Sequence, residues 1–415
     1  MPTSADLAIA TPPLAGARAP SPGANQAIVA AAAGLLLIGA LALTGAVSWR
    51  QGALFLIGGF AGISLYHAAF GFTSAWRVFL ADRRGAGLRA QMLMLALAAI
   101  VFYPLLAQGS VFGLPVKGEI GAVGLSVLAG AFLFGIGMQL GGGCASGTLY
   151  TGGGGNSRMI VTLAAFVAGS TTGAYHFSWW AATPNIGPVS LVATLGWPTA
   201  LALALVLFAG ISALSLVLER RRHGAAAGPG AGGTVSARRF LTGPWPLLWG
   251  AVALVLCNVA TLLLAGRPWG VTSAFALWGS KIAGSAGLDV AAWPYWANPA
   301  RAQALKDSVF ADVTSVMDFG IVLGAMLAAG LAGKFSPGWR VPGKSLAAAV
   351  IGGLMMGYGA RLAYGCNIGA YFSGISSSSL HGWVWFAAAL SGSAVGTRLR
   401  PLFGLAVERT RLTGC

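Results

Sequence analysis

A glycine-rich stretch that holds a single cysteine occurs twice in this chain. The first copy is Gly135–Gly152, GIGMQLGGGCASGTLYTG, and the second is Gly357–Gly374, GYGARLAYGCNIGAYFSG. An ungapped alignment places Cys144 on Cys366, and most glycines of the first copy fall on glycines of the second. A match of this density indicates an internal duplication, in which each half keeps one thiol among glycines.

A shorter motif repeats in the same order. Gly71–Ala75 reads GFTSA and Gly270–Ala274 reads GVTSA, so a Thr–Ser pair precedes the cysteine motif in both halves. The two motifs recur at spacings of roughly 200 and 220 residues. Duplicated transporters are built from such repeats, so the pattern predicts two pseudo-symmetric inverted repeats with a narrow central pore at their interface.

The low charge of the chain excludes a soluble globule. Only 8% of the residues are charged, 56% are hydrophobic, and the mean hydropathy is +0.77. The formal charge of +16 comes from short basic clusters between apolar runs, as expected of cytoplasmic loops, so we expect no nucleic-acid partner. We predict an all-α, multi-pass protein of the bacterial inner membrane, surrounded by the lipid bilayer.

The apolar runs predict about ten spanning or broken helices, with a half-length helix at Gly71–Arg77 and an interfacial loop at Gly287–Asp312. The expected spans are Ala27–Trp49, Gln51–Phe70, Leu88–Ala107, Gly118–Leu140, Ile160–Trp180, Leu191–Leu218, Trp245–Ala265, Val313–Gly333, Ser345–Tyr364 and His381–Gly396.

A change of composition separates the two halves. Glu219–Thr242 combines basic clusters with a low-complexity stretch rich in Gly, Pro and Ala, which is typical of a flexible linker. The expected organisation is a disordered tail without signal-peptide features (1–26), a first transmembrane repeat (27–218), a basic linker (219–243), a second repeat (244–400) and a C-terminal tail (401–415).

The glycines around the two cysteines predict an anion path. Glycine frees the backbone from the helical conformation, and amide N–H groups released at half-helix ends attract anions. The candidate pore residues are Cys144, Cys366, Gly143, Gly365, Ser146, Thr73, Ser74, Thr272, Ser273, Gln139 and Arg361.

The cysteines themselves allow two interpretations. A neutral thiol is a weak, polarizable hydrogen-bond donor that suits transient contact with a soft sulfur atom, whereas a buried cysteine can also serve as a small apolar residue in packing. Because Cys144 and Cys366 recur at equivalent positions, we favour the functional interpretation. Cys257 lies in a plain apolar run and is assigned to packing, and the role of Cys415 stays open.

The polar candidates also have alternatives. The hydroxyls of Thr73, Ser74, Thr272 and Ser273 either face the solute or bond to their own backbone. Arg361 either attracts an anion into the pore or extends to the membrane interface, and its counterpart Gln139 is uncharged. The histidines and cysteines show no metal-ligand spacing, and no nucleotide motif is present, so we expect neither a metal nor a cofactor.

At these motifs the sequence resembles the YeeE/YedE family of inner-membrane sulfur transporters, which includes bacterial thiosulfate uptake proteins. The likeness lies in GGGCASG at Gly141–Gly147, GRPWGVTSAFALWGSK at Gly266–Lys281 and GARLAYGCNIG at Gly359–Gly369. The resemblance implies a pseudo-symmetric helical hourglass with Cys144 and Cys366 at its waist. Thiosulfate transporters of this type use a third cysteine near the first-half break, where this chain has Thr73 and Ser74 instead.

The expected function is therefore transport of a small sulfur-containing anion, most simply thiosulfate, and not an enzymatic reaction. Another reduced sulfur oxyanion or a selenium analogue remains an alternative solute. Two other functions stay open: a membrane thiol–disulfide enzyme with Cys144 and Cys366 as its redox pair, and a docking platform that binds a cytoplasmic sulfur-carrier protein through the basic linker.

Overall fold

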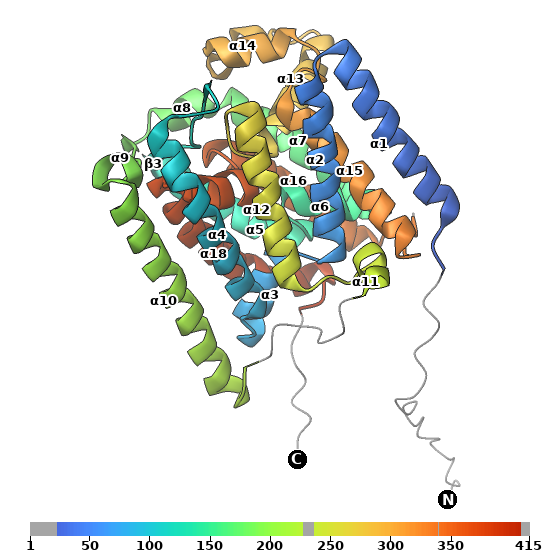
Figure 1. Cartoon of the computed structure of the whole chain (residues 1–415), viewed down its shortest axis with the longest axis vertical. Coiled ribbons are helices and arrows are strands. Elements are labelled where there is room, and N and C mark those ends of the chain that lie inside the picture. Colours follow the sequence, from blue (N-terminus) through green and yellow to red (C-terminus); the bar gives the residue numbers. More distant parts are fainter. Residues whose placement is uncertain (1–22, 227–235, 339, 408–415) are drawn as a thin grey trace, which may run out of the picture.

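The computed structural model describes residues 23–226, 236–338 and 340–407. Expectations for residues 1–22 of the tail, for residues 227–235 of the linker and for Cys415 lie outside these described residues. Within them the regular secondary structure is helical apart from two short antiparallel strand pairs (Figure 1). The all-α architecture predicted from the sequence is confirmed.

The first half begins with four helices and ends with the longest one. In chain order it contains α1 (Gln26–Ala46), α2 (Trp49–His67), α3 (Phe72–Asp82), α4 (Ala86–Gln108), β1 (Ser110–Val111), β2 (Leu114–Pro115), β3 (Ala122–Gly124), α5 (Leu125–Gly141), α6 (Ala145–Gly153), α7 (Ser157–Tyr175), α8 (Phe177–Ala181), β4 (Asn185–Pro188), α9 (Leu191–Leu195) and α10 (Trp197–His223).

The second half repeats the order of a long helix, a short helix whose first turn holds the Thr–Ser motif, and a broken pair that holds the cysteine. It contains α11 (Ala237–Thr242), α12 (Leu247–Ala265), α13 (Thr272–Ser285), η1 (Val290–Ala292), η2 (Pro294–Ala297), α14 (Pro299–Lys306), α15 (Val313–Leu331), α16 (Gly343–Leu362), the π-helix η3 (Asn367–Ser373), α17 (Gly374–Ser376), α18 (Leu380–Leu399) and η4 (Arg400–Phe403).

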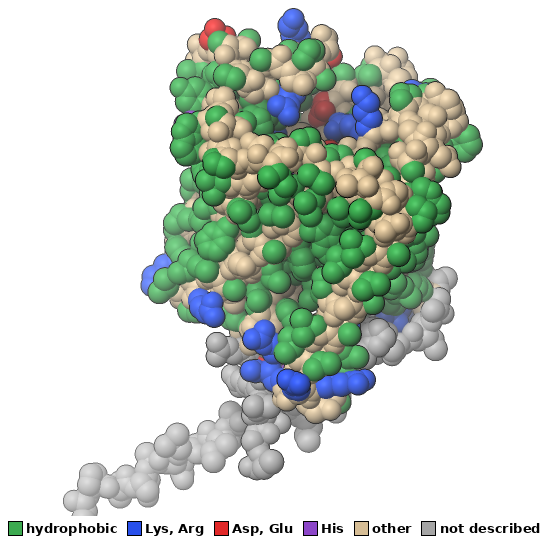
Figure 2. All heavy atoms as spheres, turned by 90° about the vertical axis from the view of Figure 1, so that its left-hand side faces the viewer, with side chains coloured by type: hydrophobic (Ala, Val, Ile, Leu, Met, Phe, Trp, Pro, Cys, Tyr) green, Lys and Arg blue, Asp and Glu red, His purple; other side chains and the backbone are tan. Residues whose placement is uncertain are grey.

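Eight helical segments of the described chain are long and apolar enough to cross a membrane. The helices α1 and α10 lie on opposite flanks of the bundle and are largely exposed (Figure 1). Figure 2 shows a broad hydrophobic middle zone, with Lys and Arg side chains gathered toward the two ends. An apolar surface of this extent is stable only against lipid, so the chain is a multi-pass membrane protein.

The duplicated glycines let the central helices approach closely. Helices α5 and α16 pack on each other, and each also packs on a helix of the opposite half, α5 on α18 and α16 on α7. A Cβ atom at Gly135 would overlap the carbonyl oxygen of Ala389, and one at the equivalent Gly357 would overlap that of Phe166. Small residues at such crossings are typical of membrane helix packing.

One expected span starts later than predicted. The span expected at Gly118–Leu140 is helical only from Leu125, because the residues before it are extended, with β3 paired to β4. The backbone N–H of Glu119 donates to Ser377 Oγ at 2.9 Å, and that of Gly121 donates to His381 Nδ1 at 3.1 Å. These bonds to the opposite half hold the segment as a loop over the bundle.

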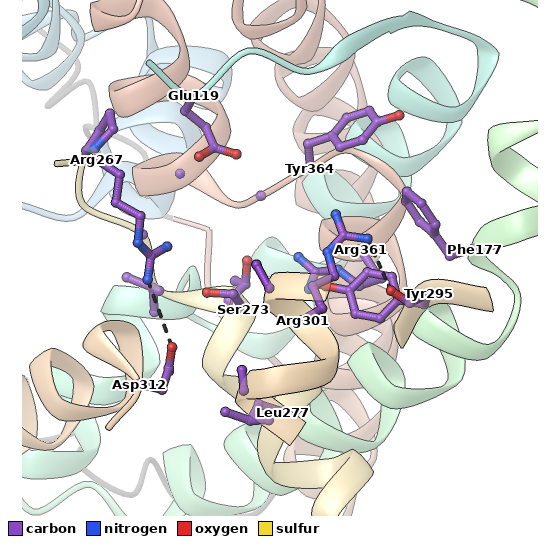
Figure 3. A pocket seen from close by; sticks show the side chains of 18 of the residues that line it. Glu119, Phe177, Arg267, Ser273, Leu277, Tyr295, Arg301, Asp312, Arg361 and Tyr364 are labelled. Atoms are coloured by element: carbon purple, nitrogen blue, oxygen red, sulfur yellow. Dashed lines mark hydrogen bonds and ion pairs between the residues drawn. The ribbon is translucent and has the colours of Figure 1, made fainter. Parts of the chain in front are cut away.

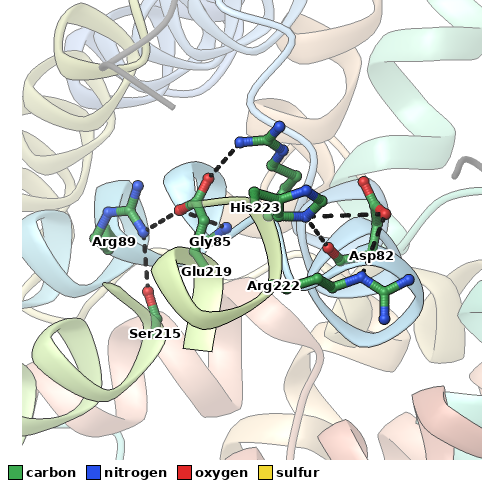
Figure 4. A network of polar contacts seen from close by, with 8 residues as sticks. Asp82, Gly85, Arg89, Ser215, Glu219, Arg222 and His223 are labelled. Carbon is green, nitrogen blue, oxygen red and sulfur yellow. Dashed lines mark hydrogen bonds and ion pairs between the residues drawn. The ribbon is translucent and has the colours of Figure 1, made fainter. Parts of the chain in front are cut away.

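The C-terminal turn of α10 is tied to the α3–α4 connection by a polar network (Figure 4). The buried carboxylate of Glu219 accepts from Arg89 at 2.7 Å and from the backbone N–H of Gly85 at 3.2 Å. Asp82 pairs with Arg222 at 3.8 Å. The helix therefore continues through Glu219, the first residue of the expected linker, to His223.

Candidate functional site

Cys144 and Cys366 each cap the N-terminal end of a short buried helix. Cys144 precedes α6 and Cys366 precedes η3, and these two elements contact each other in the core. The backbone N–H of Gly147 donates to Cys144 Sγ at 3.4 Å, and that of Ile368 donates to Cys366 Sγ at 3.4 Å. Because the backbone uses each sulfur as an acceptor, the S–H hydrogen is left to donate to another group.

The chain turns sharply just before each cysteine. Gly142 has a φ of 90° and the aligned residue Tyr364 has a φ of 59°, so both adopt the left-handed conformation. This conformation is strained for a tyrosine by about 1–3 kcal/mol. Gly143 and Gly365 then lead directly into the cysteines, and the turn separates α5 from α6 and α16 from η3. The breaks predicted from the glycine pattern occur at these positions.

Ser146 belongs to the first of these helix ends. Its Oγ lies 3.4 Å from Cys144 Sγ, and Thr148 donates to the Cys144 carbonyl at 2.9 Å. Both hydroxyls are buried, so they supply polar contacts beside the thiol within the protein interior.

Several buried polar atoms near the helix breaks have no hydrogen-bond partner among the described residues. They include Thr73 Oγ1, both carboxylate oxygens of Asp318 and both polar side-chain atoms of Asn367, the neighbour of Cys366. Cys144 and Asp318 both lie within electrostatic range of Cys366. An unpaired buried polar group destabilises a fold by about 1–3 kcal/mol. Asn367 lies next to Cys366 in the chain, so its unpaired amide favours an interior that accepts water or a polar solute.

Gln139 and Arg361 align in the repeat but contact different groups. Gln139 is buried, donates to the Thr73 carbonyl at 3.2 Å and accepts from Arg77 at 3.3 Å. Arg361 is buried and donates to the hydroxyl of Tyr295 at 2.6 Å. The structure therefore joins Gln139 to the first Thr–Ser motif, whereas Arg361 faces a cavity next to the second.

A cavity of about 430 Å³ is lined by Gly365 and Gly369, on either side of Cys366 in sequence, and by residues of α14 (Figure 3). It brings together four of the sequence-predicted residues, Thr272, Ser273, Arg361 and Gly365. Ser273 Oγ donates to Thr314 Oγ1 at 3.0 Å. The other charged residues that line the cavity were not predicted from the sequence: Glu119, Arg267, Arg301 and Asp312.

A second cavity, of about 220 Å³, lies beside the first Thr–Ser motif. It is lined by Gly71, by Ser74 and by Gln91 of α4. Ser74 Oγ donates back to the Gly71 carbonyl at 3.1 Å, which is one of the two alternatives expected for this hydroxyl. A Cβ at Gly71 would lie 3.5 Å from the hydroxyl of Tyr150 on α6, so this cavity adjoins the helix that Cys144 caps.

Some functional candidates could not be found from the repeats. Gln91 accepts from Trp76 Nε1 at 2.8 Å, and Asn258 accepts from the backbone N–H of Trp269 at 2.8 Å. Ser373 donates to the Trp269 carbonyl at 2.6 Å, so Asn258 and Ser373 together fix the segment before α13. The sequence signal that could have identified Gln91 and Asn258 is an amide side chain in an otherwise apolar helix. Such a side chain is uncommon within a membrane span and needs a hydrogen-bond partner when it is buried.

Comparison with known proteins identifies the family. The family described as sulphur transport matches residues 67–395, which include both cysteine motifs and both Thr–Ser motifs. The chain belongs to this family. The resemblance noted in the sequence is thereby confirmed, and the chain is a transporter and not an enzyme.

Individual relatives cover different shares of the chain. The thiosulfate transporter TsuA of Spirochaeta thermophila is 29% identical over 339 residues, which are 79% of this chain and 92% of TsuA. The probable transporter YedE of Escherichia coli is 30% identical over 173 residues, 41% of this chain and 42% of YedE. YedE of Salmonella typhimurium is 32% identical over 154 residues, 36% of this chain and 37% of that protein. The match thus spans less than half of either YedE protein.

Proposed function

We propose that this member of the family passes a sulfur-containing anion, with thiosulfate as its preferred solute, through a narrow pore between two pseudo-symmetric inverted repeats. The observation that carries the proposal is the contact between α6 and η3, two short helices that are each capped by a buried cysteine. The two cavities described above adjoin these helices from different sides. The similarity to a thiosulfate transporter over most of the chain supports this solute.

In this mechanism the two ends of the anion meet different groups. The S–H groups of Cys144 and Cys366 donate to the terminal sulfur, since their own sulfurs already accept backbone N–H groups. The hydroxyls of Ser146 and Thr73 and the amide of Asn367 serve the oxyanion end. Thiol contacts are weak, and weak contacts in series favour passage over retention.

The charge distribution suggests how the protein lies in the bacterial inner membrane. Basic residues of the α3–α4 connection and the last turn of α10 gather at one end, which the positive-inside rule assigns to the cytoplasm. The larger cavity, beside α14, then faces the outside. An anion would enter there and pass Cys366 before Cys144.

Two alternatives remain as outcomes of a test. A thiol–disulfide enzyme needs a reactive thiolate that a partner can reach, whereas both cysteines are buried here. A docking platform for a soluble sulfur carrier would depend on the linker, whose residues 227–235 lie outside the described structure. Neither has a specific observation in its favour.

The test is uptake of radiolabelled thiosulfate into proteoliposomes that contain the full chain, with sulfite, sulfate and selenite measured in parallel. We expect thiosulfate uptake by the wild type and its loss in Cys144→Ala and in Cys366→Ala at equal protein content. Cys257→Ala is the matched control, because Cys257 is buried and free but lies in a plain apolar helix.

Full uptake by both variants would overturn the role of the thiols. Trapping a mixed disulfide between Cys144 or Cys366 and a soluble partner would favour the redox alternative instead. Deleting Gly224–Ser236 addresses the docking alternative, since a pore should keep its uptake without this segment.

A further inference from the structure

The charged residues that line the cavity near Cys366 have no part in the proposed contacts between the anion and the two thiols. We propose that this cavity is a capture site for a small doubly charged oxyanion, which is bound by Arg267, Arg301 and Arg361 when Glu119 is protonated and is repelled when Glu119 is ionised. The inference rests on the proposed function, because it takes the captured anion to be the one that later reaches the cysteines.

Tyr295 holds two of the three guanidinium groups. Arg361 Nη1 donates to its hydroxyl at 2.6 Å, and the guanidinium carbon of Arg301 lies 4.3 Å from the centre of its ring. Arg301 Nη1 also donates to the Tyr295 carbonyl at 3.3 Å. Figure 3 shows both guanidinium groups beside this ring, at the border of the cavity. Their side chains are thus positioned before an anion arrives, which lowers the entropy lost on binding.

The same two arginines have no carboxylate partner. Within the described residues neither Arg301 nor Arg361 forms an ion pair, whereas Arg267 lies 3.9 Å from Asp312. A guanidinium that lines a cavity without a carboxylate is a ready partner for an oxyanion, because its fork of N–H donors matches two oxygens of the ligand. Two such groups, with the ion-paired Arg267 on the same cavity, favour a ligand with two charges over a ligand with one.

Glu119 lies across the cavity from these arginines. Its backbone N–H is fixed to Ser377 Oγ at 2.9 Å, and Figure 3 shows its carboxylate directed into the space between Arg267 and Arg361. Within the described part of the chain the carboxylate makes no hydrogen bond and no ion pair. Its side chain is therefore a negative charge that shares the cavity with any incoming anion.

Burial raises the pKa of the Glu119 carboxyl, although Arg267, Arg361 and Arg301 act in the opposite direction. Glu119 therefore takes up a proton at a higher pH than an ordinary glutamate does. The protonated acid adds no negative charge and offers an O–H donor to the oxyanion, so it changes from a competitor into a ligand. Binding should strengthen as the pH falls through this raised pKa.

Other charged or titratable groups face Glu119 from the surrounding elements. Beside the three arginines, Asp312 at the start of α15, Tyr295 of η2 and Tyr364 line the cavity. Lys117 lies two residues before Glu119 on the same segment, and His381 of α18 contacts that segment at Gly121. Asp312 caps α15 and lies near Arg267, and His381 Nδ1 is bonded to the Gly121 N–H, so both have structural partners. Glu119 alone among the carboxylates of the cavity has none in the described chain.

The experiment measures binding of thiosulfate and of sulfate to the purified full-length protein in detergent, by calorimetry and by tryptophan fluorescence, since Trp296 lines the cavity. Both anions keep two charges between about pH 5 and about pH 8, so only the protein titrates in this range. We expect the affinity of the wild type for both anions to rise as the pH falls through the raised pKa of Glu119.

Three variants separate the roles. Glu119→Gln should bind both anions tightly at every pH, whereas Arg301→Gln should weaken binding by about tenfold or more throughout. Tyr295→Phe keeps the ring under Arg301 but removes the hydroxyl that positions Arg361, so it should raise the KM of uptake and leave the maximal rate unchanged. Asp307→Asn removes a carboxylate next to α14 but outside the cavity, and it should behave as the wild type.

The wild type alone can overturn the inference, because an affinity that does not change with pH contradicts it even if a variant fails to fold. Suppose that thiosulfate uptake depends on the cysteines but that binding does not change with pH, or that Glu119→Gln shows the same pH dependence as the wild type. Either result refutes the capture site and leaves the proposed function standing. If binding shows the predicted pH dependence but the protein transports no sulfur anion, the capture site stands and the proposed function is refuted.

Discussion

Gly135 and Gly357 occupy equivalent places in the two halves and face equivalent neighbours. The first lies against the Ala389 carbonyl of α18, and the second lies against the Phe166 carbonyl of α7. Each of these partner helices follows the cysteine of the opposite half. The glycine that precedes one cysteine in sequence is therefore packed against the helix that follows the other.

Replacing either glycine by alanine should destabilise the protein. Because a Cβ at Gly135 or Gly357 overlaps backbone atoms, which cannot rotate away, each change should cost about 1–3 kcal/mol of folding free energy. Thermal unfolding of the purified protein, followed by size-exclusion chromatography, measures the effect. Gly210→Ala is the control, since no atom lies within 4 Å of the added carbon. Equal unfolding temperatures for all three variants would refute the close approach.

Asn367→Leu should separate stability from transport. The buried amide has no partner for either polar atom in the described chain, so an apolar side chain of similar size should leave the unfolding temperature unchanged or raise it. We expect thiosulfate uptake to fall by about tenfold or more, because a contact for the oxyanion is lost beside Cys366. Normal uptake would show that the amide does not meet the solute.

Glu219→Gln should loosen the end of α10. The buried carboxylate accepts from Arg89, Arg84 and the Gly85 N–H, so removing its charge leaves two guanidinium groups without their partner. Breaking a buried ion pair on one side costs about 3–5 kcal/mol, and the partial exposure of the arginines, 30% for Arg84 and 21% for Arg89, reduces this to about 1–3 kcal/mol. Hydrogen exchange of residues 80–90 should become faster. Unchanged exchange would mean that α10 does not hold this connection.

The stability of the protein should depend on pH through Glu119. Its pKa is raised in the folded state, so the folded protein holds this proton more tightly than the unfolded chain does. The associated stability is present at low pH and is lost as the pH rises from about 4 through the raised value. The unfolding temperatures of the wild type and of Glu119→Gln are compared in buffers without oxyanions. As the pH rises over this range, the wild type should become less stable relative to the variant. A constant difference would contradict the raised pKa.

The sequence predicted the backbone of the site better than its electrostatics. The repeat located both cysteines and the breaks before them, because glycine patterns and apolar run lengths report on local backbone geometry. It also identified Arg361 and the Thr272–Ser273 pair, and the structure places all three at one cavity. The late start of α5 was missed, since the bonds of Glu119 and Gly121 to residues near α18 are made far along the chain.

Other features of the site could not be predicted from the sequence alone. Glu119, Tyr295 and Arg301 come from a loop, a short 3-10 turn and an interfacial helix, and only tertiary packing brings them to Arg361. The use of the two thiols as helix caps was equally hidden, because cysteine is not among the side chains that usually accept N–H groups at helix ends.

The crossed packing of α5 on α18 and of α16 on α7 also limits how the protein can move. Each half contributes a helix to the other half at contacts where backbone meets backbone, so neither half can swing away as a rigid body without separating these surfaces. A route between them would keep a nearly constant width and would show no alternation between inward-open and outward-open states. Flow of an anion through it would follow the electrochemical gradient, and net uptake against that gradient would require that the solute be consumed on the far side.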